Sequence, residues 1–183
     1  MIYFLRHGLD DERYVGGYSN VGLTKEGIIG VRESSIKLKG YNISKIVSSD
    51  ILRAKQTSLI VSSYLDVSVT YTPKLREMDK GLVNGMLKDE ALKLYGEYMH
   101  TRDINKRFPN GESLMDLYLR IRDYLAEILT YEDTLFVTHR GVINMIYFIL
   151  NDISLNYDKE AFNVTHASAH ELDKEKMKIK KLF

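Results

Sequence analysis

The sequence predicts an α/β fold, a three-layer α/β/α sandwich with a mostly parallel central sheet and a C-terminal antiparallel edge hairpin. Three observations predict it. Short β-rich runs alternate with amphipathic helical patterns along most of the chain, which is typical of βαβ units. The last two predicted strands instead follow one another directly, as in a hairpin. No internal repeat, low-complexity tract or linker divides the 183 residues, so we expect a single domain over 1–183.

The parallel part of the sheet is predicted from four short runs, at residues 2–6, 43–48, 67–71 and 134–138. Helical patterns cover residues 24–39, 50–65, 88–99, 113–129 and 141–150. Thr24 is placed to cap the first helix, and Ser49 or Asp50 to cap the second. Ser113 begins the clearest helix, where Asp116 completes a capping box.

The C-terminal hairpin is predicted at residues 163–172 and 176–182. Lysines alternate with apolar residues in its second strand, at Lys176, Met177, Lys178, Ile179 and Lys180. Charged side chains at alternate positions are a common protection of an exposed sheet edge. This strand is therefore expected at the edge of the sheet.

Composition excludes several classes of function. The 26 Lys and Arg residues nearly balance 25 Asp and Glu residues, giving a net charge of +1, so no nucleic-acid partner is expected. The absence of cysteine excludes disulfides and thiolate chemistry. The apolar run at the N-terminus is too short for a signal or membrane segment. We expect a cytoplasmic protein with no membrane partner.

Polar side chains follow the predicted strands where each strand ends. Arg6 and His7 follow the first strand, Arg53 lies just beyond the second, Glu77 beyond the third and His139 beyond the fourth. Open α/β sheets bind ligands outside the carboxyl ends of their strands. Arginine forks match phosphate oxygens, so these junctions predict a site for a phosphorylated ligand.

These junctions belong to an ordered set of motifs along most of the chain. They are Arg6-His7-Gly8, Leu23-Thr24 with Gly27, Ser49-x-x-Leu52-Arg53-Ala54-x-x-Thr57, Leu75-Arg76-Glu77-x-x-x-Gly81, Gly111-Glu112-Ser113 and Val137-Thr138-His139. Together they resemble the histidine phosphatase superfamily, the phosphoglycerate-mutase-like branch 1, in a small phosphatase-type member. Any one motif is weak, whereas the ordered set is specific.

The resemblance implies a role for each residue. His7 is the nucleophile and forms a phosphohistidine, while Arg6, Arg53 and His139 surround the phosphate. Glu77 donates a proton to the leaving oxygen and later activates water. The roles are physically consistent, because nearby guanidiniums keep an imidazole neutral and offset the charge of a phosphate dianion. No metal and no other cofactor is implied.

The chain departs from the family pattern at two places. Family members commonly carry an Asn six residues after the nucleophile, where this chain has Arg13. Arg13 or the backbone at Gly16 and Gly17 is expected to contact the phosphate instead. Arg140 and Gly141 follow the second histidine, where two glycines are usual, and Arg140 adds a third cation.

Several assignments have alternatives. Asp79 and Glu112 are other candidates for the acid assigned to Glu77. His166 and His170 share a predicted face and form a conceivable metal pair, although without a third ligand in register a structural role is favoured.

Residues 84–111 are interpreted as a lid or specificity region, or else as a solvated excursion on the surface. Within them His100, Arg102 and Arg107 are candidates for reading the leaving group.

The predicted function is a metal-independent phosphomonoesterase for a small phosphorylated metabolite. The alternatives are a phosphoglycerate mutase, which is disfavoured because mutases of this family are longer chains, and a non-catalytic module that binds phosphorylated ligands. The sequence specifies neither the natural substrate nor the oligomeric state.

Overall fold

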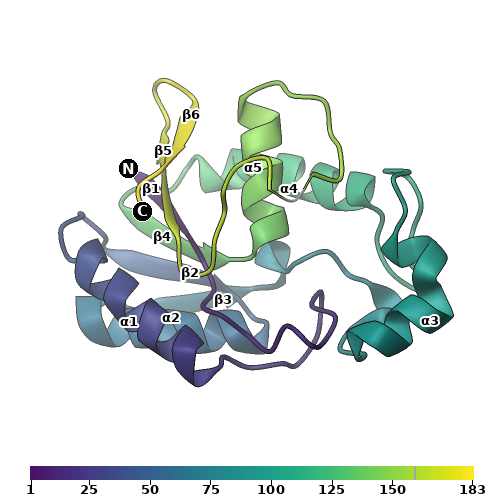
Figure 1. The fold of residues 1–183 in the computed structure, drawn as a ribbon. Coiled ribbons are helices and arrows are strands. Elements are labelled where there is room, and N and C mark those ends of the chain that lie inside the picture. The colour runs from purple at the N-terminus through teal and green to yellow at the C-terminus, as the bar shows by residue number, and fades with distance from the viewer. Residues whose placement is uncertain (159) are drawn as a thin grey trace.

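A computed structural model describes residues 1–158 and 160–183, and within them six strands form one mixed sheet in the order β3-β2-β4-β1-β5-β6 (Figure 1). The strands are β1 (Ile2–Arg6), β2 (Lys45–Ser49), β3 (Val69–Thr72), β4 (Thr134–Thr138), β5 (Ala169–Asp173) and β6 (Lys178–Lys181). β1 to β4 are parallel, and β5 and β6 are antiparallel. The predicted fold class is confirmed, including the edge hairpin.

Helices cover both faces of the sheet. They are α1 (Lys25–Leu38), α2 (Leu52–Leu65), α3 (Lys88–Met99), α4 (Leu114–Ile128) and α5 (Arg140–Leu150), with short 3-10 turns at Pro73–Leu75 and Gly81–Val83. Side chains alternate across β1, so Tyr3 and Leu5 pack with α1 and α2, while Ile2 and Phe4 pack with α4 and α5. α3 lies apart from the sheet, beyond the edge where β1 and β4 end (Figure 1).

The predicted caps of α1 and α4 are confirmed, whereas the predicted cap of α2 is not. Thr24 caps α1, and Ser113 forms the capping box of α4. α2 begins later than predicted, at Leu52, with no side-chain cap. Ser49 and Asp50 are engaged elsewhere, because Asp50 forms an ion pair with a neighbouring arginine and Ser49 contacts a histidine of the site described below. The prediction that either residue caps this helix was wrong.

The sheet ends as the lysine pattern predicts. β6 is the last strand in the order, its Lys178 and Lys180 side chains are exposed and Ile179 is buried. Within the parallel part of the sheet, the pairing of β4 with both β1 and β2 places the carboxyl ends of these three strands side by side. Among the described residues, no helix is long and apolar enough to span a membrane.

Candidate active site

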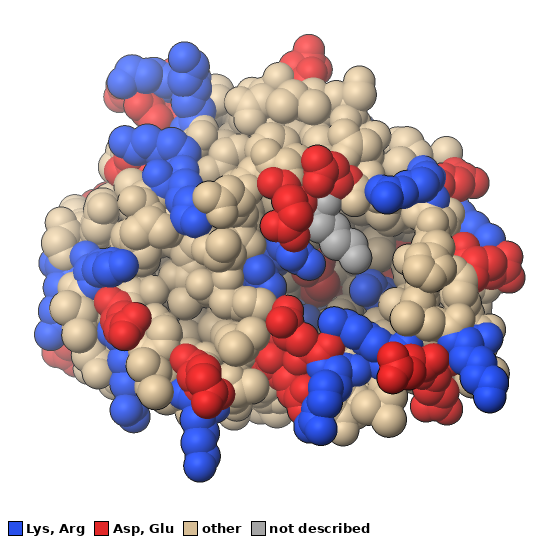
Figure 2. All heavy atoms as spheres, in the orientation of Figure 1, with Lys and Arg blue, Asp and Glu red and all other residues tan. Residues whose placement is uncertain are grey.

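A cavity of about 730 Å³ opens at the carboxyl ends of the parallel strands. Figure 2 shows it as a hollow in the face of the molecule, with basic and acidic side chains around it. We call the part at the strand ends the inner cavity; it is lined by Arg6, His7, Asp10, Gly17, Arg53, Glu77, Arg140 and Gly141. Of the residues predicted to act in catalysis or to bind the phosphate, all but Arg13 and His139 therefore lie in the lining, and His139 is buried beside His7.

His7 is held with one nitrogen free to act as a nucleophile. Its Nδ1 lies 2.7 Å from the carbonyl oxygen of Gly8, which can only accept a hydrogen bond, so Nδ1 carries the proton. Its Nε2 accepts a hydrogen bond of 3.2 Å from Nε of Arg53. Burial, followed by the charge of Arg53, lowers the pKa of His7 well below its ordinary value. The ring is therefore neutral, with its lone pair on Nε2.

Arg53 is almost fully buried, and all of its nitrogens are engaged. Besides His7, it donates to Oγ of Ser19 at 3.1 Å and to the carbonyl oxygen of Gly17 at 2.9 Å. Asp10 lies 3.5 Å from its Nε. Fixed donors of this kind need little reorganisation when an anion arrives.

Arg6 is anchored by the segment that precedes β5. It donates to the carbonyl oxygen of Val164 at 2.8 Å, and Nη2 lies 2.5 Å from Nε2 of His166. Its Nε is buried and has no partner within the described residues. Burial and the charge of Arg140 lower the pKa of Arg6 to about 10, so the guanidinium is still charged at neutral pH. One buried N–H of this cation therefore has no hydrogen-bond partner within the described residues.

His139 is fully buried at the start of α5, and its ring centroid lies 5.1 Å from that of His7. Its Nε2 lies 2.9 Å from Oγ of Ser49, while its Nδ1 has no partner among the described residues. Burial, Arg53 and Arg6 lower the pKa of His139 well below its ordinary value. A second neutral imidazole thus stands beside the first.

Glu77 lies at the N-terminus of α5. The oxygens of its carboxyl group accept hydrogen bonds from the backbone N–H of Met78 at 2.9 Å and of Gly141 at 3.0 Å. A Cβ at Gly141 would stand 2.1 Å from Oε1 of Glu77, so this close approach requires glycine. Of the three candidate acids only Glu77 lines the cavity, since Glu112 pairs with Arg120 and Asp79 binds neighbouring loop groups.

The residues at the two departures from the family pattern, those expected to replace the Asn and the added cation Arg140, separate into two groups. Gly17 lines the inner cavity in the left-handed conformation (φ 63°), and Arg140 also lines it while pairing with Glu160 at 2.9 Å. Arg13 pairs instead with Asp11, and its side chain is 77% exposed. The structure does not bring Arg13 to the cavity.

Two residues beside His7 were not assigned to this site from the sequence: Asp10 was not singled out, and His166 was considered only as part of a conceivable metal pair with His170. Asp10 lies 3.7 Å from His166, and these two with His7 place possible metal ligands within 4.8 Å of one another. Arg6 and Arg53 lie against the same atoms, and their positive charges oppose a bound cation, so we assign no metal there. Burial opposes ionisation of Asp10, but the contact with His166 lowers its pKa to about 2.

His170 is separate from this cluster. It is buried against Tyr147 and Ser168, so the conceivable metal pair with His166 is not formed. Asp10 could have been predicted as a site residue, because it lies only three residues after His7 in the sequence. No local pattern in the sequence could place His166 at this site, because it is 160 residues away from Arg6, the residue it contacts.

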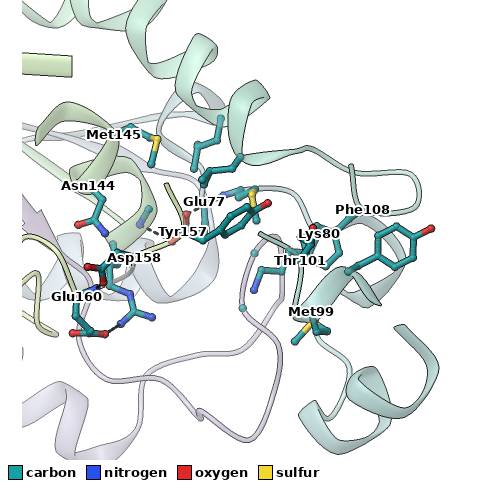
Figure 3. Close-up of a pocket in the computed structure, with 18 of the residues that line it drawn as sticks. Glu77, Lys80, Met99, Thr101, Phe108, Asn144, Met145, Tyr157, Asp158 and Glu160 are labelled. Carbon is teal, nitrogen blue, oxygen red and sulfur yellow. Dashed lines mark hydrogen bonds and ion pairs between the residues drawn. The ribbon is translucent and has the colours of Figure 1, made fainter. Parts of the chain in front are cut away.

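The rest of the cavity, which we call the outer cavity, lies beyond Glu77. Its lining includes Tyr98, Met99, His100, Thr101, Arg102, Phe108, Leu114, Leu117, Met145, Phe148, Asn156, Tyr157 and Asp158 (Figure 3). The lid or specificity region 84–111 therefore contributes one wall. Of its candidate cations, His100 and Arg102 line the cavity, while Arg107 pairs with Asp116.

Comparison with protein families gives one match over nearly the whole chain, to the histidine phosphatase superfamily (branch 1), over residues 2–183. Among curated proteins, the chain is 29% identical over 135 residues to a probable phosphoglycerate mutase GpmB of Enterobacter. That match covers 70% of this chain and 62% of the relative, so the chain spans less than two thirds of its length.

Solved structures share the fold. A mycobacterial glucosyl-3-phosphoglycerate phosphatase, in complex with inorganic phosphate, superposes with a TM-score of 0.81 and 22% identity, covering 100% of this chain and 95% of that one. The alpha-ribazole phosphatase of Shigella flexneri gives a TM-score of 0.81 at 21% identity, covering 98% and 93%. At these identities the likeness concerns the arrangement of the sheet and its helices.

Proposed function

The chain belongs to the histidine phosphatase superfamily (branch 1), and from that premise we propose that it is a metal-independent phosphomonoesterase acting through a phosphohistidine on a small phosphorylated metabolite. The observation that carries the proposal is the state of His7. Its imidazole is neutral, its Nε2 lone pair faces Arg53 and its other nitrogen is fixed by the backbone. A nucleophile needs this arrangement.

The first step transfers the phosphoryl group to the enzyme. The Nε2 lone pair of His7 forms a bond to phosphorus as the bond between phosphorus and the leaving oxygen breaks. Glu77 gives its proton to that oxygen, so the product leaves as an alcohol. The Nε donor of Arg53 passes from His7 to a phosphate oxygen, and Arg6 and Arg140 offset the remaining charge.

The second step returns the enzyme to its starting state. Glu77, now a carboxylate, takes a proton from water, and the resulting hydroxide attacks phosphorus. The N–P bond breaks, its electrons return to Nε2 of His7, and phosphate is released. No metal is needed, because guanidiniums supply the positive charge that a metal ion supplies in other phosphatases.

A mutase is the second candidate, since the names of several curated relatives describe phosphoglycerate mutases. In a mutase the phosphohistidine passes its phosphoryl group to another substrate hydroxyl instead of water. Incubation with 3-phosphoglycerate and a trace of the bisphosphate separates the two reactions. Isomer formation faster than phosphate release would favour the mutase.

The direct test is phosphate release from an aryl phosphate in the presence of a chelator. We expect turnover without added metal, and a loss of at least about 10³-fold in kcat for His7→Ala. Lys178→Ala is the control, because Lys178 is exposed on the edge strand β6 and does not line the cavity, and it should keep full activity. Binding without turnover would support the non-catalytic module, and metal-dependent turnover in His7→Ala would contradict the proposal.

A further inference from the structure

We propose that the outer cavity binds an aromatic or heteroaromatic ring in the alcohol part of the substrate, so that the preferred substrates are ring-bearing phosphomonoesters rather than three-carbon phosphorylated acids. This inference rests on the proposed phosphatase function and adds a substrate class to it. Three features carry it: the size of the cavity, its apolar floor and its aromatic walls.

The cavity is larger than a three-carbon phosphorylated acid needs. Pockets of about 300–1,000 Å³ hold ligands of drug size, and this one measures about 730 Å³. A phosphate group fills only the inner cavity between Arg6 and Arg53. A three-carbon acid would leave most of the remaining space to water.

The floor of the outer cavity is made of core side chains. Leu114 and Leu117 of α4 and Met145 and Phe148 of α5 line it, and each is at most 8% exposed. All four belong to the hydrophobic cluster that packs against the sheet. A ligand that covers this floor gains about 25 cal/mol of binding free energy for each Å² of apolar surface that it removes from water. The floor therefore favours an apolar group.

The walls carry aromatic rings from two distant parts of the chain. Tyr98 and Phe108 stand on the wall formed by α3 and the loop after it, with ring centroids 6.1 Å apart. Tyr157 comes from the segment after α5, and Figure 3 shows its ring beside the cavity together with that of Phe108. Flat, stiff side chains contact a planar ring with little loss of conformational freedom.

Polar groups in the lining suit a heteroaromatic ring better than an acid. Thr101 and Asn156 place a neutral hydroxyl and a neutral amide in the lining, where the amide also bonds within its own loop, and Asp158 places a carboxylate there. Of the lysines and arginines in the lining outside the inner cavity, Lys88 and Arg102 are exposed, and Lys80 lies over the ring of Phe108. The outer cavity thus lacks the buried, paired-cation arrangement that the inner cavity offers to an anion.

The test compares kcat/KM for four phosphomonoesters: adenosine 5′-monophosphate, 3-phenylpropyl phosphate, n-octyl phosphate and 3-phosphoglycerate. We expect the two ring-bearing esters to exceed 3-phosphoglycerate at least about tenfold, which corresponds to about 1.4 kcal/mol. Tyr98→Ala and Tyr157→Ala should each lower kcat/KM for the ring-bearing esters about tenfold and leave 3-phosphoglycerate within twofold. Tyr118→Ala is the control, since Tyr118 is half-buried in α4 and does not line the cavity.

Two results would overturn the inference: 3-phosphoglycerate hydrolysed as fast as the ring-bearing esters, or n-octyl phosphate matching them with no effect of either tyrosine variant. Failure of the proposed function looks different, because then no ester is hydrolysed. In that case calorimetric binding of the same four esters decides the inference. Preferential binding of the ring-bearing esters supports it, and equal or no preference contradicts it.

Discussion

The inner and outer cavities differ in what holds their residues in place. Arg6, His7 and His139 stand at the ends of β1 and β4, whose register pairs Arg6 with Thr138. A shift of one residue would turn every side chain of a strand to the opposite face, so sheet pairing fixes these groups firmly. The walls of the outer cavity come from α3, the loop after it and the segment after α5, none of which is a strand of the sheet. We therefore expect the groups fixed by the sheet to carry out the chemistry and the loops around the outer cavity to select the substrate.

The difference should be largest in the response to acid. The inner cavity holds two buried imidazoles, His7 and His139, whose pKa values are lowered in the folded protein, and the pKa of His170 nearby in the fold is lowered to about 4. In the unfolded chain all three take up protons below about pH 6.5. Because the unfolded chain then binds more protons, the free energy of unfolding falls with decreasing pH, by about 1.4 kcal/mol per pH unit for each histidine.

Urea unfolding at pH 7.5 and 5.5 measures how far the free energy of unfolding falls. In His139→Gln we expect a smaller fall, because one of the three histidines no longer contributes. His100→Gln serves as the control in the outer cavity, where the side chain is exposed. A stability independent of pH over this range would mean that the folded inner cavity takes up protons as readily as the unfolded chain.

Gly141→Ala tests how closely the inner cavity is fitted. The new methyl group would meet the flexible end of Glu77, so the carboxylate moves while the fold is retained. We expect kcat to fall about 10- to 100-fold for alkyl phosphates, whose leaving oxygens need a proton, and much less for aryl phosphates. Gly30→Ala, at an open position in α1, should leave kcat unchanged. An equal loss for both substrate classes would argue against Glu77 as the acid.

Arg13→Ala should have the smallest effect. Its guanidinium is largely exposed and paired with Asp11, and solvent-screened surface ion pairs of this kind contribute little. We expect the KM for an aryl phosphate to change less than twofold, against a large increase for Arg53→Lys. A comparable increase in both variants would place Arg13 at the phosphate after all.

The comparison also explains which features the sequence predicts. β1 and β4 were predicted with their observed bounds, because a fully buried strand is a continuous apolar run that stops where polar residues begin. Their ends carry Arg6, His7 and His139, so most of the inner cavity was predicted with them. The choice of Glu77 over its neighbours agrees with its position in the lining.

Features that depend on distant contacts were not predicted. The anchoring of Arg6 by His166 joins residues 160 positions apart, and the segment around Tyr157 has no pattern that points to a cavity. The capping of α2 was mispredicted for a related reason, since Ser49 is used by His139 rather than by its own helix. The local sequence pattern predicts helices and strands well, but it does not predict which of two available groups a side chain will hydrogen-bond.

The most direct test of the mechanism is to trap the phosphoenzyme. Glu77→Gln should still be phosphorylated by an aryl phosphate, which needs little help from an acid, but should hydrolyse the intermediate slowly because it lacks the base. Rapid quenching in alkali followed by peptide mapping should find about one phosphate per chain on His7, stable to base and labile to acid, and none in the protein that also carries His7→Ala. Steady turnover of the unaltered protein, with no base-stable phosphate on His7 in either form, would contradict the account.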